Sequence, residues 1–114
     1  MAFIKYHNIN GSSNSTVELI KPGSQVDNIE SILITNTHAT ATATVTLFIQ
    51  DNPTSGTALT FKILSTVAIP SDTSLLLNDS SIFKFKNKTS DSFGLYITVG
   101  GSDTLDVLIN TTNL

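Results

Sequence analysis

The sequence has no cysteine, no tryptophan and no arginine, and each absence narrows what the protein can be. Without cysteine there are no disulfide bridges, no thiolate metal ligands and no thiol nucleophile. A net charge of −3 with only six lysines disfavours electrostatic binding to the phosphates of a nucleic acid. No apolar run approaches the roughly 20 residues of a membrane-spanning helix, and the N-terminus lacks the pattern of a cleaved secretion signal. We therefore expect no direct nucleic-acid partner and no membrane partner.

Uncharged polar residues take the place of charged ones. Ser, Thr and Asn make up 41 of the 114 residues, whereas charged residues make up 13%. Helical bundles normally cover their surfaces with Glu, Lys and Arg, so this composition disfavours a bundle. The apolar fraction of 39% is enough to fill one modest core, which disfavours disorder. The composition is typical of a single all-β domain.

Alternation of apolar and polar residues is the strongest pattern in the chain. Within residues 41–50, Val45 and Leu47 alternate with threonines, which predicts a strand with one face on a core and the other toward water. Phe48 breaks the alternation and is expected to point outward. The same test predicts further strands at 3–6, 16–20, 29–35, 58–64, 73–77, 82–86, 93–99 and 105–109.

Eight to nine short strands, spaced about a dozen residues apart, predict a single antiparallel β-sandwich of the jelly-roll or Ig-like kind. A closed barrel is disfavoured because the strands are short and uneven. In the segment 58–64, Leu59, Phe61 and Ile63 are expected to share the inward face. The spacing of the turns indicates no internal repeat and no linker within the sandwich.

Two connections bear on the organisation of the chain. Gly100 and Gly101 can take the positive φ of a short loop, so the last two strands are expected to pair as a hairpin. The polar stretch 8–15 has almost nothing apolar to pin it. We therefore divide the chain into an N-terminal strand and polar arm at 1–15 and a β-sandwich domain at 16–114. Such an arm can add its strand to the sheet edge of a neighbouring subunit.

The inventory of reactive groups is thin. His7 and His38 have no metal-site spacing. Several acidic residues fall in predicted turns, where the carboxylate bonds nearby backbone groups; these are Asp72, Asp79, Asp91 and Asp103. Calcium held between loops remains the metal alternative. An enzyme would need a loop that brings one of the two histidines within hydrogen-bond reach of an aspartate. We predict no catalytic residue, no cofactor, no metal site and no enzymatic activity.

Lysines recur at every second position near residue 86. On a strand, Lys84, Lys86 and Lys88 would form a row of ammonium groups on one face. We interpret the row as a charged edge that resists aggregation. The alternative is an electrostatic seam that meets a partner subunit or nucleic acid.

Some large apolar residues fall on the face opposite the main apolar set of their strand. Apolar groups that gather into one exposed patch usually mark an interface, whereas scattered ones mean nothing. We expect an interface built from Phe48, Leu64, Leu76 and Leu108, with Phe3 and Tyr6 of the first strand as a docking element.

Three segments follow one another in a recognisable order. A strand ending in Ile34-Thr35-Asn36-Thr37 leads through a small-residue loop into the alternating strand 43–49. A turn at Asp51 and the block 67–75, with its Ile-Pro turn, come next. Over about residues 17–109 the chain resembles small all-β structural proteins of tailed, particularly marine, bacteriophages. The polar segment 8–15 departs from that pattern.

The resemblance implies a non-enzymatic, multi-copy component of the phage particle, either a capsid decoration (cement) protein or a protein of the neck, tail or fibre attachment. The implied partners are other virion proteins, namely the major capsid protein or tail and neck subunits, together with further copies of this chain in a homo-oligomer. The implied location is the virion, assembled in the host cytoplasm. The alternative is a carbohydrate-binding or host-recognition β-sandwich module, against which the lack of tryptophan counts.

Overall fold

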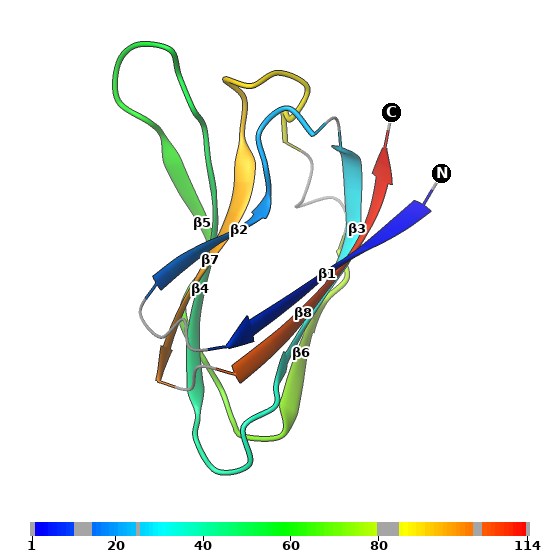
Figure 1. Ribbon diagram of the computed structural model, residues 1–114, viewed down its shortest axis with the longest axis vertical. Coiled ribbons are helices and arrows are strands. Elements are labelled where there is room, and N and C mark those ends of the chain that lie inside the picture. Colours follow the sequence, from blue (N-terminus) through cyan, green and yellow to red (C-terminus); the bar gives the residue numbers. More distant parts are fainter. Residues whose placement is uncertain (1, 11–14, 25, 80–84, 102–103, 114) are drawn as a thin grey trace.

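Figure 1 shows a computed structural model of the chain, which describes residues 2–10, 15–24, 26–79, 85–101 and 104–113. In these described ranges, eight strands form two antiparallel sheets packed face to face, which confirms the predicted β-sandwich. The strands are β1 (Ala2–Asn10), β2 (Ser15–Ile20), β3 (Val26–Asn36), β4 (Ala43–Gln50), β5 (Thr60–Ile69), β6 (Thr73–Leu77), β7 (Gly94–Gly101) and β8 (Thr104–Asn113). Within the described ranges, no helix is long and apolar enough to span a membrane.

The strand pairing is nested. One sheet has the order β1-β8-β3-β6 and the other β2-β7-β4-β5. First pairs with last, second with seventh, third with sixth and fourth with fifth, as if one long hairpin had been folded over on itself. An eight-stranded double sheet of this kind is a jelly roll. The structure therefore decides between the two sandwich types that the sequence left open.

The hairpin expected between the last two strands is wrong. β7 belongs to one sheet and β8 to the other, so their connection crosses from sheet to sheet. Each strand buries an alternating apolar set completely: Leu95, Ile97 and Val99 on β7, and Leu105, Val107 and Ile109 on β8. Because both sets point into the core between the sheets, the strands face each other across it instead of lying side by side.

The core is aliphatic. Among the described residues, the fully buried apolar side chains are those of Ile, Leu, Val and Ala, and isoleucine supplies much of the volume. Ala43, Val45 and Leu47 on β4 are all 0% exposed, as their alternation predicted. Branched aliphatic side chains suit a pleated surface that is covered on one side. Burial of this set is the main driving force for the two sheets to pack together.

A buried asparagine holds the β3–β4 connection against the end of β5. Asn36 donates from Nδ2 to the carbonyl oxygens of Ala41 (2.8 Å) and Ile69 (3.0 Å). Its Oδ1 accepts the backbone N–H of His38 at 3.0 Å. Ile69 is the last residue of β5, and Pro70 ends that strand, as the sequence predicted. The asparagine of the Ile-x-Asn-Thr segment is thus a structural residue.

β5 departs most from its predicted orientation. It pairs with β4 through two register shifts, one on each side of Leu47, and Thr66 at the first shift has a φ of 47°. A bulge reverses the facing of the residues that follow it. Leu64, expected to point outward, is therefore placed opposite Leu47 and packs against the core. Leu59 and Phe61, expected to share the inward face with Ile63, are 55% and 54% exposed, whereas Ile63 packs against the core.

The position of both residues at the start of β5 explains their exposure. Leu59 precedes the strand, and Phe61 is its second residue and lies opposite Ile49. The start of β5 lies at the end of the sandwich where the two sheets diverge (Figure 1). A side chain directed between diverging sheets is left without the cover that it has at the centre of the sandwich. The alternation of apolar residues in a segment does not predict this exposure, because the exposure depends on how far the opposite sheet extends.

The first strand was expected to belong to an arm that can pair with a neighbouring subunit, and the chain was divided at residue 15. β1 pairs with β8 along its full length, from Ala2 opposite Thr112 to Asn10 opposite Thr104, so it is an edge strand of its own sandwich. Residues 11–14 lie outside the described part, and the division at residue 15 stays a prediction.

The strand expected at 82–86 is not found in its described part. Residues 85 and 86 are not in a strand, and 82–84, including Lys84, lie outside the description. Lys86 and Lys88 belong to an irregular segment, so the described lysines form no strand-edge row.

Candidate functional site

A row of apolar side chains crosses the outer face of the sheet β1-β8-β3-β6. The register places Tyr6 opposite Leu108, Leu108 opposite Leu33, and Leu33 opposite Leu76. Tyr6 is 72% exposed, Leu76 55% and Leu108 37%, while Leu33 is half-buried. We call these four residues the apolar row. Sequence reasoning missed Leu33, although its place between the buried Ile32 and Ile34 could have marked it as outward-facing.

A polar row runs beside the apolar row on the same face. Asn8 donates to Oδ1 of Asp106 at 2.6 Å, and the hydroxyls of Thr35 and Ser74 are 2.8 Å apart. These four residues are themselves in register across the sheet. A shallow hollow of about 320 Å³ lies along the β1 side of the two rows. An apolar centre with a polar border is the usual anatomy of a protein interface.

The outer face of the other sheet is organised differently. Here the register runs from Glu18 to Tyr96, then to Phe48 and Lys62, which we call the aromatic row. The rings of Phe48 and Tyr96 stack with centroids 5.6 Å apart and planes 20° apart, and both side chains are half-buried. The pKa of Tyr96 is raised, first because partial burial disfavours the phenolate and then because of the Glu18 carboxylate, which repels that charge and hydrogen-bonds the phenol.

The structure therefore separates the six predicted contact residues. Tyr6, Leu76 and Leu108 come together in the apolar row, whereas Phe48 lies on the opposite outer face. Leu64 packs against the core. Phe3 stands opposite Thr111 in the β1–β8 pairing, and its side chain lies outside the described part.

Both histidines contact backbone groups. His7 Nε2 lies 3.0 Å from the carbonyl oxygen of Leu19, which belongs to the opposite sheet. His38 Nδ1 accepts the backbone N–H groups of Thr40 (3.1 Å) and Ala41 (2.9 Å) and so shapes the β3–β4 connection. In the part of the chain that is described, no group of three or more His, Asp or Glu residues could hold a metal ion.

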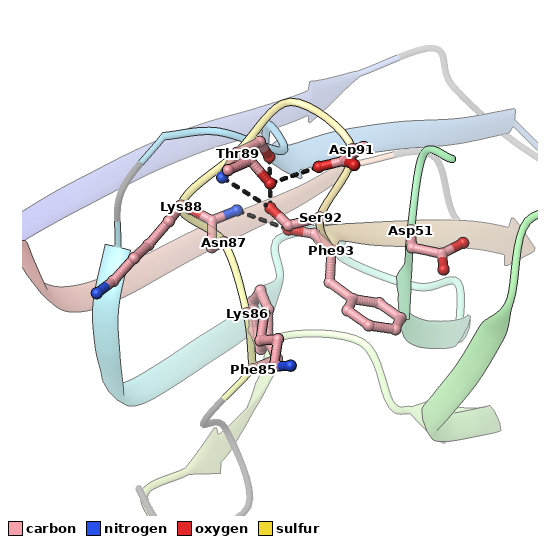
Figure 2. A pocket seen from close by; sticks show the side chains of 9 residues that line it. All are labelled: Asp51, Phe85, Lys86, Asn87, Lys88, Thr89, Asp91, Ser92 and Phe93. Atoms are coloured by element: carbon pink, nitrogen blue, oxygen red, sulfur yellow. Dashed lines mark hydrogen bonds between the residues drawn. The ribbon is translucent and has the colours of Figure 1, made fainter. Parts of the chain in front are cut away.

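A cleft of about 590 Å³ opens where the sheets diverge, between the end of β4 and the segment 85–93 (Figure 2). It is lined by Asp51, Phe85, Lys86, Asn87, Lys88, Thr89, Asp91, Ser92 and Phe93. The sequence analysis did not predict this site. Its two walls are more than thirty positions apart in the chain, and neither carries a recognisable motif.

One wall of the cleft is held by the buried Asn87. Its Nδ2 donates to the carbonyl oxygens of Lys21 (3.1 Å) and Phe93 (2.6 Å), which ties the segment to the end of β2. Next to it, a Cβ on Gly94 would lie 2.6 Å from the carbonyl oxygen of Ile20. Only glycine permits this close approach of backbone to backbone. The segment is thus fixed against β2 before any ligand arrives.

The other wall is braced by the β4–β5 connection. Asp51 accepts the backbone N–H of Leu59 at 2.7 Å through Oδ1, and its own N–H donates to the Leu59 carbonyl at 3.1 Å. Asn52 then reaches across and donates to the carbonyl oxygen of Ser90 at 3.1 Å. The two walls are therefore joined by a direct hydrogen bond.

Comparisons with known proteins place the fold. No family model matches the sequence, and no curated protein matches it either. A chain in the structure of infectious bursal disease virus, Gx strain, matches with a TM-score of 0.55 and 14% identity, over 99% of this chain and 32% of that one. A chain from the crystal structure of a viral particle of the same virus matches with a TM-score of 0.55 and 12% identity, over 99% and 31%.

A third match is to the CBM22-1-GH10 modules of a Clostridium thermocellum endo-1,4-beta-D-xylanase complexed with xylohexaose. It has a TM-score of 0.45 and 12% identity, over 99% of this chain and 25% of that one. The chain spans about a third of the length of the viral chains that it matches. At these identities the likeness concerns the fold alone: the protein is an all-β sandwich similar to part of a viral particle protein.

Proposed function

We propose that the protein is a non-enzymatic structural component of a bacteriophage particle, present in many copies and located in the virion after assembly in the host cytoplasm. It binds neighbouring capsid, tail or neck subunits and further copies of itself, and capsid decoration is the favoured role. The observation that carries the proposal is the apolar row on the outer face of a jelly roll. The fold likeness to chains of a viral particle and the phage-like segments support it.

The energetics of the apolar row suit a multi-copy assembly. Covering a half-exposed large apolar side chain contributes on the order of 1 kcal/mol to the free energy of binding. The four side chains of the apolar row therefore give a single subunit contact that is weak on its own. Symmetry repeats each such contact across a particle, and avidity then makes the assembly tight. The charged fraction of only 13% limits repulsion between closely packed copies.

Particles purified from a host that carries this gene provide the test. We expect the protein to co-sediment with particles in a density gradient, at tens of copies or more per particle by quantitative mass spectrometry. A cryo-EM map should show the sheet β1-β8-β3-β6 facing the neighbouring subunit. Absence of the protein from purified particles would overturn the proposal.

A pair of matched variants tests the contact surface. Leu108→Asp places a charge at the centre of the apolar row, whereas Thr44→Asp places one on the outer face of the central strand β4 in the other sheet. We expect Leu108→Asp to lower the copy number per particle at least tenfold, because the carboxylate would have to be desolvated on binding. Thr44→Asp should keep the wild-type copy number. Equal incorporation of both variants would remove the apolar row from the proposal.

A second candidate function is a carbohydrate-binding or host-recognition module. The observation that favours it is the cleft at the open end of the sandwich, whose lining residues include two phenylalanines and side chains of both charge signs. A glycan array probed with the whole chain tests this candidate, and tight binding by a protein that is absent from particles would promote it over the first.

A further inference from the structure

The walls of the cleft carry two kinds of group. Phe93 supplies an aromatic ring, which Figure 2 shows on the side of the segment that faces Asp51. Phe61 extends this surface, with its ring centroid 5.9 Å from that of Phe93 and the planes tilted by 53°. Two carboxylates, of Asp51 and Asp91, and the ammonium group of Lys86 stand among the other lining groups.

The charges on the walls select a neutral ligand. The lining residues include two aspartates and two lysines, so their formal charges balance, although Figure 2 shows the Lys88 side chain directed away from Asp51 and Phe93. An anion would meet Asp51 and Asp91, and a cation would meet Lys86. A ligand with many hydroxyl groups suits both, because a hydroxyl donates to a carboxylate and accepts from an ammonium group.

Size and rigidity also fit a small-molecule site. Ligand clefts typically measure about 300–1,000 Å³, and the 590 Å³ of this cleft lies within that range. The hydrogen bonds of Asn87 and Asn52 hold its walls without help from a ligand. A preformed site loses less conformational entropy on binding than one that must be ordered.

We propose that the cleft binds a short neutral saccharide. The C–H face of one sugar ring packs against Phe93, whose negative ring face attracts the slightly positive hydrogens. The hydroxyl groups of the sugar donate to Asp51 and Asp91 and accept from Lys86. The site lies at the open end of the sandwich and shares no residue with the apolar row, so it would operate on a subunit already docked through that row.

The first experiment is a glycan array probed with the full-length protein. The array carries neutral hexose, pentose and N-acetylhexosamine oligosaccharides beside sialylated and sulfated ones. Binding to neutral glycans is expected, followed by amide shifts at residues 85–93 when the best neutral oligosaccharide is titrated into labelled protein. Binding restricted to acidic glycans, or no amide shift in the cleft at millimolar oligosaccharide, would overturn the proposal.

Three variants test which side chains of the cleft contact the saccharide. Asp91→Asn and Lys86→Gln each remove a charge at nearly constant shape, and either is expected to weaken binding about tenfold through loss of a charge-assisted hydrogen bond. Phe93→Leu keeps an apolar side chain without a ring and should weaken binding several-fold. Asp72→Asn, in the turn between β5 and β6, is the matched control and should bind like the wild type.

The outcomes separate the two proposals. Unchanged affinity in Asp91→Asn, Lys86→Gln and Phe93→Leu, each with a wild-type fold by amide spectrum, would overturn the saccharide site and leave the particle role intact. Unchanged saccharide affinity in Leu108→Asp is expected, because that residue lies on the outer face of the other sheet. Loss of binding in that folded variant would contradict the assignment of the site to the cleft.

Discussion

The two outer faces of the sandwich each carry a row of four side chains in register. The rows differ in how far neighbouring side chains cover their apolar members. In the aromatic row, Phe48 stacks on Tyr96 and charged residues close both ends. In the apolar row, Tyr6, Leu76 and Leu108 are each more than a third exposed, and every member is apolar or aromatic. An outward orientation alone therefore does not show whether an apolar side chain is free to contact another molecule. The side chain opposite it on the next strand decides this, because it either covers the apolar group or leaves it exposed.

The largest effect should separate the two sides of one strand. Val107 is 0% exposed and its neighbour Leu108 is 37% exposed. Val107→Asp should cost more than about 4 kcal/mol, because it buries a carboxylate among aliphatic groups, and this approaches the whole stability of a small domain. Leu108→Asp should change the free energy of unfolding by less than about 1 kcal/mol. Urea denaturation measures both, and similar losses would mean that the apolar row is part of the core.

A smaller effect compares the two rows in the isolated protein. Phe48→Ala removes a half-buried ring and its stack on Tyr96, so we expect a loss of about 2 kcal/mol. Leu76→Ala trims a side chain that is 55% exposed on the edge strand β6 and should cost less than about 1 kcal/mol. The two urea midpoints, taken at one protein concentration, provide the comparison. A larger loss for Leu76→Ala would reverse the roles that we give to the rows.

The smallest effect is a titration within the aromatic row. The pKa of Tyr96 is raised by partial burial first and by Glu18 second, so Glu18→Gln should lower it part of the way toward the ordinary value of about 10. In the wild type the unfolded chain loses this proton at a lower pH than the folded one does. The contribution to stability is therefore complete below the unfolded pKa and is lost as pH rises through the folded pKa. Phenolate absorbance in a Tyr6→Phe background, which leaves one tyrosine, measures the shift; an unchanged pKa in Glu18→Gln would contradict the role of Glu18.

The sequence predicted the sandwich because alternation is a local signal. Val45, Leu47 and their neighbours on β4 show it plainly, and the burial follows it. The pairing of strands depends on long-range contacts, so two glycines after Val99 suggested a hairpin where the chain in fact crosses between sheets. The facing of Leu64 was wrong for a related reason, since a bulge opposite Leu47 is not encoded in the alternation of either strand.

The candidate sites follow the same division. Leu76 and Leu108 were predicted from their parity on two strands, and Tyr6 was predicted as part of the first-strand docking element. Only the register shows that Leu33 joins them into one row. The cleft could not be predicted, because it is formed by the packing of an irregular segment against the end of a distant strand. A surface formed by paired strands can therefore be predicted in part from the sequence. A cleft formed by the packing of distant segments cannot.

Each row contains one of the two tyrosines of the chain, so a single footprinting measurement compares them in the assembled particle. Hydroxyl-radical oxidation of Tyr6 and Tyr96 would be quantified by mass spectrometry in free protein and in intact particles. We expect Tyr6, 72% exposed in the free chain, to be protected at least several-fold in particles, while Tyr96 reacts at an unchanged rate. Equal oxidation of Tyr6 in the two states would contradict the assignment of the apolar row as the surface that meets neighbouring subunits.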